Sequence, residues 1–206
     1  MKFIGDLSLE DADILSLYGK RAKRILEFGC GGSTQIFSQC KPDRLVSIET
    51  NQEWIEVTKR RVQKLGGTEP EFRPYDFIPL TEQFDLIFVD GIDLLRRGFA
   101  LGTWKTLSVG GAMIFHDTRR FQDFQNAAWV AQAYFNEVMT IMVNARARNN
   151  KSSNMTMILK KEHEPYVNWN YTEGKPLEAY GDLSENDEFF PVGLWNENMR
   201  ECNIKE

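Results

Sequence analysis

One glycine-rich segment combines the residue types that bind a nucleotide-like ligand. Residues 24–34 read Arg-Ile-Leu-Glu-Phe-Gly-Cys-Gly-Gly-Ser-Thr, in which an apolar run and an acid precede a cluster of glycines. Glycines let the chain turn tightly and bring backbone N–H groups against a ligand. Ser33 and Thr34 are typical of a helix start, because their hydroxyls can cap its free N–H groups. The segment therefore predicts a strand, a binding loop and a helix in succession.

Glu27 distinguishes between two cofactors that such a loop can hold. A loop that binds the pyrophosphate of a nicotinamide dinucleotide reads G-x-G-x-x-G, without an acid just before it. The pattern here is E-x-G-x-G-G, which lacks the third glycine and whose carboxylate would repel phosphates. A cationic cofactor that ends in an amino group tolerates the acid. The residues therefore favour S-adenosylmethionine, with an ordinary tight turn as the alternative.

Composition and cysteine usage set the class of protein. The chain has 206 residues, 42% of them hydrophobic, which is enough to bury a core in a medium-sized domain. Cys30, Cys40 and Cys202 are odd in number and lack metal-ligand spacing, which predicts reduced thiols in the cytoplasm. The N-terminus lacks the apolar core of a signal peptide, and no apolar run reaches membrane-spanning length. We therefore expect a cytoplasmic protein that has no membrane partner.

The distribution of charge argues against nucleic acid as a partner. The net charge is −5, and acidic residues outnumber basic ones 11 to 4 in residues 161–206. A bulk basic surface is therefore not indicated. The D/N-P-P-Y pattern that clamps a flipped base is absent, and no basic stripe is interleaved with aromatic residues.

Hydrophobic periodicity predicts a sheet that alternates with helices. The order of strands and amphipathic helices is typical of a mostly parallel sheet covered on both faces. The polar segment 144–154 is too short for a crossover helix, so the strands on either side of it should pair antiparallel. The predicted strands are 24–28, 44–49, 71–74, 84–90, 112–116, 138–143 and 155–160. The predicted helices are 8–19, 50–65, 94–107 and 124–134, besides the helix that follows the glycine loop.

Four segments in this order resemble one enzyme family. They are ILEFGCGGST at 25–34, VSIET at 46–50, FDLIFVDG at 84–91 and LSVGGAMIFHD at 107–117. Residues 8–160 resemble class I S-adenosylmethionine-dependent methyltransferases, and are similar in particular to small-molecule O-methyltransferases related to the catechol and macrolide-sugar enzymes. The resemblance implies a three-layer Rossmann-like α/β fold with seven strands, mostly parallel with the last antiparallel. We therefore expect an S-adenosylmethionine-binding methyltransferase domain at 1–160.

The cofactor residues follow from chemistry and from the resemblance together. Glu49, at the end of the second strand, is suited to accept hydrogen bonds from both ribose hydroxyls; an acid that only stabilises the next helix start is the alternative. Asp76 matches the family's acceptor for the adenine amino group, and Phe77 or Tyr75 would pack on the ring, although either could be a core residue. The predicted cofactor-binding residues are Glu27, Gly29, Cys30, Gly31, Ser33, Thr34, Glu49, Thr50, Asp76, Phe77 and Asp90.

Three residues are predicted to be catalytic. Asp90 and Asp117 end neighbouring strands at the edge where α/β proteins bind ligands. Relatives that depend on a metal hold a magnesium ion with acids at these positions, but Thr118 stands where their pattern has an asparagine, so a divalent metal is not favoured. His116 is suited to remove a proton near neutral pH, with a structural role as the alternative.

Basic residues after the last strands suggest the nature of the acceptor. Arginines follow the fourth and fifth strands and lie between the sixth and seventh, where they would bind phosphate or carboxylate, unless they are only solvated. The predicted substrate-binding residues are Arg97, Arg119 and Arg146. Residues 161–206 form an aromatic-rich C-terminal extension that we expect to pack on the domain, near these loops or in a homodimer contact.

The sequence therefore predicts an S-adenosylmethionine-dependent methyltransferase that acts on a small, possibly anionic acceptor, with oxygen as the expected methylated atom. A non-catalytic or degenerate S-adenosylmethionine-binding protein is the alternative. A nicotinamide-dependent oxidoreductase is disfavoured by Glu27 and by the missing third glycine of the loop.

Overall fold

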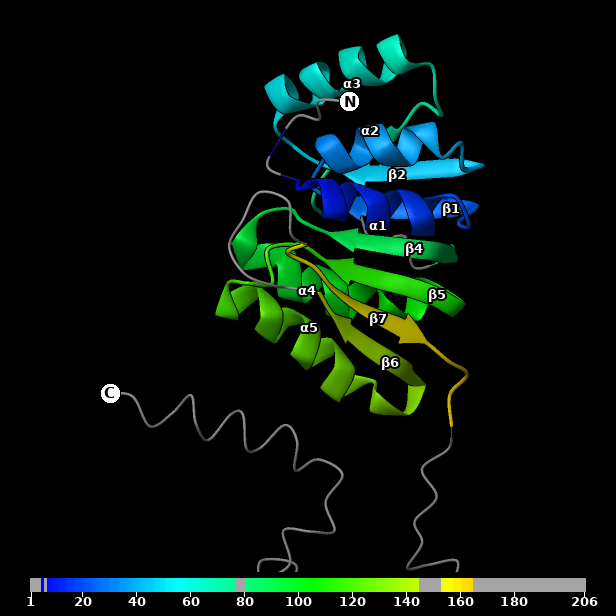
Figure 1. Cartoon of the computed structure of the whole chain (residues 1–206), viewed down its shortest axis with the longest axis vertical. Coiled ribbons are helices and arrows are strands. Elements are labelled where there is room, and N and C mark those ends of the chain that lie inside the picture. The colour runs from blue at the N-terminus through cyan, green and yellow to red at the C-terminus, as the bar shows by residue number, and fades with distance from the viewer. Residues whose placement is uncertain (1–4, 6, 77–80, 145–152, 165–206) are drawn as a thin grey trace, which may run out of the picture. The chain divides into compact units, whose positions relative to one another are not determined.

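The apolar runs of the sequence form one seven-stranded sheet with the strand order β3-β2-β1-β4-β5-β7-β6 (Figure 1). The computed structural model describes Gly5 and residues 7–76, 81–144 and 153–164. Strand β7 runs antiparallel to both its neighbours, and the other pairs are parallel, which confirms the predicted fold class. The strands are β1 (Arg24–Phe28), β2 (Arg44–Ile48), β3 (Glu71–Arg73), β4 (Phe84–Val89), β5 (Leu107–Phe115), β6 (Val138–Val143) and β7 (Thr156–Lys160).

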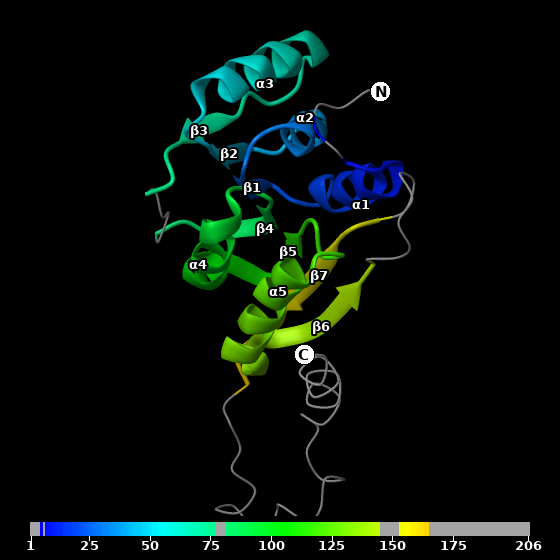
Figure 2. The same ribbon diagram turned by 90° about the vertical axis from the view of Figure 1, so that its left-hand side faces the viewer.

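The α-helices of the described residues lie on both faces of this sheet. Helices α1 and α2 lie on one side and α4 and α5 on the other, as Figure 2 shows. Helix α3 packs beside α2. The arrangement therefore has three layers. The helices are α1 (Leu9–Gly19), α2 (Gly32–Gln39), α3 (Gln52–Leu65), α4 (Asp93–Thr103) and α5 (Phe121–Ala133), with short 3-10 turns at Trp104–Thr106 and Phe135–Glu137.

The central strands are apolar on both faces because helices cover both. Ile25 of β1 belongs to the core that contains Leu15 of α1, whereas the next residue, Leu26, belongs to the core that contains Val130 of α5. Successive side chains of a strand point to opposite faces, so one apolar strand contributes to both cores. All four side chains are fully buried, and burial of each contributes about 1.5–3 kcal/mol to stability.

The winding of the chain reverses between β1 and β4. From β1 the chain proceeds to β2 and β3 on one side, and it then returns to place β4 on the other side of β1. At such a point the loops that leave two neighbouring strands diverge and open a crevice at their carboxyl ends. Gly29 follows β1 and Asp90 follows β4 directly, so the fold brings these two predicted site residues to the crevice.

Several element boundaries differ from the predicted ones, and α5 begins at Phe121 rather than at residue 124. Strand β5 begins at Leu107 rather than at residue 112, because Gly110 adopts a left-handed φ of 80° at an irregularity that lets pairing with β4 continue past the glycines. The predicted helix 94–107 ends at Thr103 and continues only as a 3-10 turn. Helix α2 has Gly31 as its N-cap, so Ser33 and Thr34 lie inside its first turn; the Thr34 hydroxyl accepts the backbone N–H of Gly31, whereas the Ser33 hydroxyl donates to Glu27.

Some predictions concern residues outside the described part of the chain. These are the cofactor residue Phe77, the substrate residue Arg146 and residues 165–206 of the C-terminal extension. The division into a domain at 1–160 and an extension at 161–206 therefore stays a prediction. Among the described residues, no helix combines the length and the apolar character that a membrane crossing requires.

Candidate functional site

A cavity of about 590 Å³ opens at the carboxyl ends of β1, β2 and β4, at the crevice between the diverging loops. A cavity of this volume is typical of sites for small ligands. The predicted cofactor residues that line it are Gly29, Cys30, Gly31, Ser33, Glu49, Thr50 and Asp90. The lining also includes Leu7, Asn51, Trp54, Tyr75, Ile92, Arg96 and Asp117.

Gly29 allows the loops after β1 and β4 to cross at close range. Its φ is 89°, in the left-handed region that side chains rarely adopt. A Cβ built at this position would lie 2.8 Å from the Cα of Gly91 and 2.9 Å from the carbonyl oxygen of Asp90. Only glycine avoids both problems, so this residue decides how near the two loops of the cavity can approach.

Glu27 organises the glycine loop from beneath and does not line the cavity. Its side chain is completely buried and accepts hydrogen bonds from the Ser33 hydroxyl, from Thr34 at 2.6 Å and from Ser47 at 2.8 Å. Burial raises the pKa of this carboxyl to about 7, although the three hydroxyl groups act in the opposite direction. Glu27 is among the predicted cofactor-binding residues, but its inward orientation does not fit a direct contact with a cofactor.

Glu49 presents one carboxylate oxygen to the cavity. Its Oε1 accepts hydrogen bonds from the backbone N–H of Thr50 at 2.7 Å, the N–H of Asn51 at 2.9 Å and the Tyr75 hydroxyl at 2.8 Å. Its Oε2 makes no such bond with the described residues. These bonds fix the orientation of the carboxylate, and one oxygen remains available for a pair of ligand hydroxyls.

Two aromatic residues contribute to the same rim. The Trp54 indole donates a hydrogen bond to the carbonyl of Cys30 in the glycine loop. Burial and the nearby Glu49 carboxylate raise the pKa of Tyr75 to about 12, so the phenol keeps its proton. Asp76, the predicted adenine acceptor, is exposed and does not line the cavity. Tyr75 is therefore the aromatic side chain of this segment that the structure brings to the cavity.

Asp90 and Asp117 line the cavity and enclose a buried guanidinium, that of Arg96. The Arg96 side chain, from the first turns of α4, lies 3.2 Å from Asp90 and 3.5 Å from Asp117. It also pairs with Asp93 at 3.2 Å and with Asp123 at 2.7 Å. Burial raises the pKa of Asp90, while its cationic neighbours act in the opposite direction. The sequence placed Arg96 after the fourth strand, but its burial among four acids depends on how α4 packs against α5.

His116 lies behind these acids and does not line the cavity, since only 2% of it is exposed. Its Nδ1 is 3.2 Å from Asp90 and 3.7 Å from Asp117, and its Nε2 is 3.6 Å from Asp11. Burial lowers the pKa of the imidazole, but the facing carboxylates outweigh it and raise the pKa to about 10. The ring is then an imidazolium at neutral pH, so the predicted role as a base does not fit.

Asp11 is a contributor that sequence reasoning assigned only to a helix start. It accepts hydrogen bonds from the backbone and hydroxyl of Ser8, in the capping box that begins α1, and from the backbone N–H of Asn154. Burial would raise the pKa of Asp11, yet His116 and these donors hold it at about 2. The S-x-x-D spacing was visible in the sequence, but the partnership with His116 was not.

The predicted metal alternative can be tested against the donor groups. Asp90, His116 and Asp117 bring their ligand atoms within 4.8 Å of one another, which is close enough for one ion. However, His116 retains its proton, and the Arg96 guanidinium already pairs with both carboxylates. A metal would have to displace a buried cation that is larger and permanently charged. The residues therefore do not fit a divalent metal.

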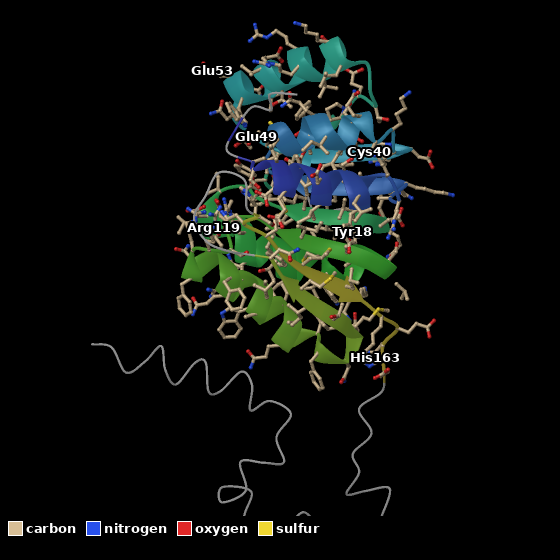
Figure 3. All side chains as sticks on the ribbon, in the orientation of Figure 1. Tyr18, Cys40, Glu49, Glu53, Arg119 and His163 are labelled. Atoms are coloured by element: carbon tan, nitrogen blue, oxygen red, sulfur yellow. The ribbon has the colours of Figure 1, made fainter. Side chains whose placement is uncertain are left out.

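Of the predicted substrate arginines, the two that the structure describes, Arg97 and Arg119, do not line the cavity. Arg97 is exposed and lies over the Trp129 ring, with its guanidinium carbon 5.4 Å from the ring centroid. The backbone N–H of Arg119 donates a hydrogen bond to the side chain of Asn154. Figure 3 shows Arg119 at the same edge of the sheet as Glu49, so it lies on the correct side of the molecule without reaching the lining.

Comparisons with known proteins give the same architecture. No family model matches the chain, and no curated protein matches it significantly. A putative O-methyltransferase from Klebsiella pneumoniae is similar, with 18% identity and a TM-score of 0.62 over 76% of this chain and 82% of that one. The O-methyltransferase TomG from Streptomyces achromogenes, solved with S-adenosylmethionine, has 20% identity and a TM-score of 0.61 over 75% and 81%. An O-methyltransferase from Bacillus cereus, solved with S-adenosylhomocysteine, has 17% identity and a TM-score of 0.60 over 75% and 83%.

These likenesses confirm the predicted fold, which is that of Rossmann-like methyltransferases. Each likeness covers about three quarters of this chain and more than four fifths of the compared chain.

Proposed function

We propose that the chain is an S-adenosylmethionine-dependent methyltransferase acting on a small acceptor that carries a hydroxyl group. The observation that carries the proposal is Glu49, which lines the same cavity as the glycine loop and whose Oε2 accepts no hydrogen bond from the described residues. A carboxylate at the end of the second strand is suited to a ribose, because it can accept from both hydroxyls. The similar structures solved with S-adenosylmethionine or S-adenosylhomocysteine support the same cofactor.

The remaining parts of the cofactor would meet residues of matching chemistry. The glycine loop and the start of α2 offer backbone N–H groups to the methionine carboxylate, where the partial positive charge of a helix start favours an anion. Tyr75 and Trp54 offer aromatic surface beside the ribose site for the adenine. Asp90, at the end of β4, lines the cavity on the side of the cationic sulfonium.

The chain's contribution to the reaction would be positioning and proton acceptance. S-adenosylmethionine supplies a methyl group made electrophilic by the attached sulfonium. An acceptor oxygen held in line forms the new C–O bond as the C–S bond breaks, and binding both partners in one cavity supplies the orientation. The proton released from the hydroxyl passes to a carboxylate, for which Asp90 and Asp117 are the groups that line the cavity. His116 cannot take it, because its ring is already protonated.

The charges of the described lining do not favour an anionic acceptor. An anionic acceptor would need an uncompensated cation, and the guanidinium that lines the cavity, Arg96, is surrounded by four carboxylates. We therefore leave the charge of the acceptor to a screen that includes phosphorylated, carboxylated and neutral sugar compounds. Release of S-adenosylhomocysteine reports turnover with each compound.

Calorimetry with S-adenosylhomocysteine and with NAD tests the cofactor. We expect heat from S-adenosylhomocysteine and none from NAD. Glu49→Ala should weaken S-adenosylhomocysteine about tenfold to a hundredfold, because charged hydrogen bonds to the ribose are lost. Glu53→Ala is the matched control, since Glu53 is exposed on α3 a few residues further along the chain and does not line the cavity (Figure 3). Equal affinity in both variants, or no heat from S-adenosylhomocysteine, would refute the assignment.

A non-catalytic S-adenosylmethionine-binding protein is the second candidate. The observation that favours it is the pairing of Asp90 and Asp117 with arginines, which leaves fewer oxygens to accept a proton. This candidate would be selected if the chain binds the cofactor but releases no S-adenosylhomocysteine in the presence of any acceptor, and if Asp117→Asn leaves every activity of the chain unchanged.

A further inference from the structure

The Arg96 guanidinium lies among four carboxylates, those of Asp90, Asp93, Asp117 and Asp123, and Arg96 lines the cavity with two of them, Asp90 and Asp117. Its side chain is 7% exposed, so it is held by the protein rather than by solvent. Nη1 lies 2.7 Å from Asp123 and 3.5 Å from Asp117, and Nη2 lies 3.2 Å from Asp90. A further bond of 2.8 Å runs from Nε to the carbonyl of Gly91.

The guanidinium connects residues from four parts of the fold. Arg96 lies on α4 and Asp123 on α5, whereas Asp90 and Asp117 follow β4 and β5. A guanidinium has its donors in a planar fork and remains charged at every physiological pH, so it can hold several carboxylates at once in one geometry. Removal of such a buried cation would leave its acids with less compensation, from His116 and the exposed Arg120.

We propose that the Arg96 side chain is the built-in cation of the acceptor site and stands in the place that a divalent metal would otherwise take. This inference rests on the proposed methyltransferase function and identifies the group that supplies positive charge beside the acceptor. The positive charge lies next to Asp90 and Asp117 at the cavity, where it would hold both carboxyl groups in place and would stabilise negative charge that develops on the acceptor oxygen. The site is therefore independent of divalent metal.

The charge balance of the cluster explains what removal of Arg96 would do. Asp90, Asp93, Asp117 and Asp123 all lie within 3.5 Å of this one guanidinium. Arg120 pairs with Asp93, Asp117 and Asp123 as well, but from an exposed position. Without Arg96, Asp90 and Asp117 would keep the His116 imidazole as a buried neighbour, at 3.2 Å and 3.7 Å, but would lose the guanidinium that lies between them and Asp123. Carboxylate oxygens with water are the ligands that hard divalent ions prefer, so the emptied place should bind Mn²⁺.

Mn²⁺ binding by the full-length chain tests this proposal. Calorimetry and Mn²⁺ electron paramagnetic resonance are recorded on the unaltered protein, on Arg96→Gln and on Arg60→Gln. Arg60 is an exposed arginine of α3 and does not line the cavity, so its variant controls for loss of one positive charge. We expect Arg96→Gln to bind Mn²⁺ at least about tenfold more tightly than the other two proteins. Asp117→Asn in the Arg96→Gln background should remove the gained affinity.

Circular dichroism shows whether Arg96→Gln folds. If it does not, Arg96→Lys serves as a second variant. Lysine keeps the charge, so this variant should exclude Mn²⁺ as the unaltered protein does. Tight Mn²⁺ binding by the unaltered protein, or no gain in a folded Arg96→Gln, would overturn the proposal. Both outcomes are separate from the cofactor assignment, because S-adenosylhomocysteine binding to the unaltered protein without added metal tests that assignment alone.

Discussion

The Thr34 hydroxyl donates a hydrogen bond of 2.6 Å to the buried carboxylate of Glu27. The same hydroxyl accepts the backbone N–H of Gly31 at 2.8 Å. One threonine in the first turn of α2 therefore connects the acid at the end of β1 to the loop that lines the cavity. The two bonds hold the backbone of the glycine loop, which would contact a ligand, in a fixed position relative to β1.

Replacement of Thr34 by valine should loosen the glycine loop. Valine keeps the volume but removes one of the three hydroxyl donors to Glu27 and leaves the buried N–H of Gly31 without its acceptor, so we expect the free energy of unfolding to fall by about 1–3 kcal/mol. Affinity for S-adenosylhomocysteine should fall with it. Denaturant unfolding and calorimetry measure the two effects. Thr34→Ser restores the hydroxyl and should lose less of both; equal losses in the two variants would contradict the role of this bond.

Gly29→Ala should be among the most destabilising single changes in the loop. The added Cβ meets backbone of Gly91 at 2.8 Å and also demands a left-handed φ of 89°. Together these costs amount to about 3 kcal/mol. Gly66, which ends α3 at a φ of 72°, has open space around its Cβ position. Gly66→Ala should therefore cost only about 1–2 kcal/mol, and thermal unfolding of both variants compares the two directly.

The buried imidazolium of His116 should make stability depend on alkaline pH. Its pKa is raised from 6.5 to about 10 in the folded chain, so its stabilising contribution is complete below pH 6.5 and is lost as the pH rises towards 10. Between these values the free energy of unfolding should fall by at most about 1.4 kcal/mol per pH unit. Urea unfolding at several pH values measures this slope.

His116→Gln should flatten that slope, because the variant has no proton to lose. The control is His163→Gln, since His163 is exposed and lies away from the cavity (Figure 3). A slope unchanged in His116→Gln would show that the imidazolium is not responsible for it.

Glu27 should add a second pH dependence at lower values. Burial raises the pKa of this carboxyl from 4.5 to about 7, so the folded chain favours its neutral form. The contribution of Glu27 to stability is therefore largest below pH 4.5 and is lost as the pH rises to 7. Glu27→Gln cannot ionise, so its stability relative to the unaltered chain should improve as the pH rises from 4.5 to 7. Denaturant unfolding across this range measures the difference, and an identical pH profile would rule it out.

The sequence by itself determined the layered architecture and the edge of the sheet that carries the site. Apolar runs bounded by glycines identified the strands, since a strand covered on both faces must be apolar on both. Residues next to strand ends were predictable for the same reason. Gly29, Glu49 and Asp90 each follow a strand of the sheet, and the carboxyl ends of parallel strands meet at one edge.

Only the tertiary structure decided which way the charged side chains of the site point. Glu27 turns into the protein because hydroxyls from α2 and from β2 meet it there, and the sequence does not reveal that all three lie within hydrogen-bonding distance. His116 becomes a buried cation because Asp11, distant in the chain, faces its other side. The partners of a charged group depend on how distant elements pack, whereas periodicity in the sequence reports only which residues are apolar. The charged partners of Arg96 and His116 were therefore decided by the tertiary structure.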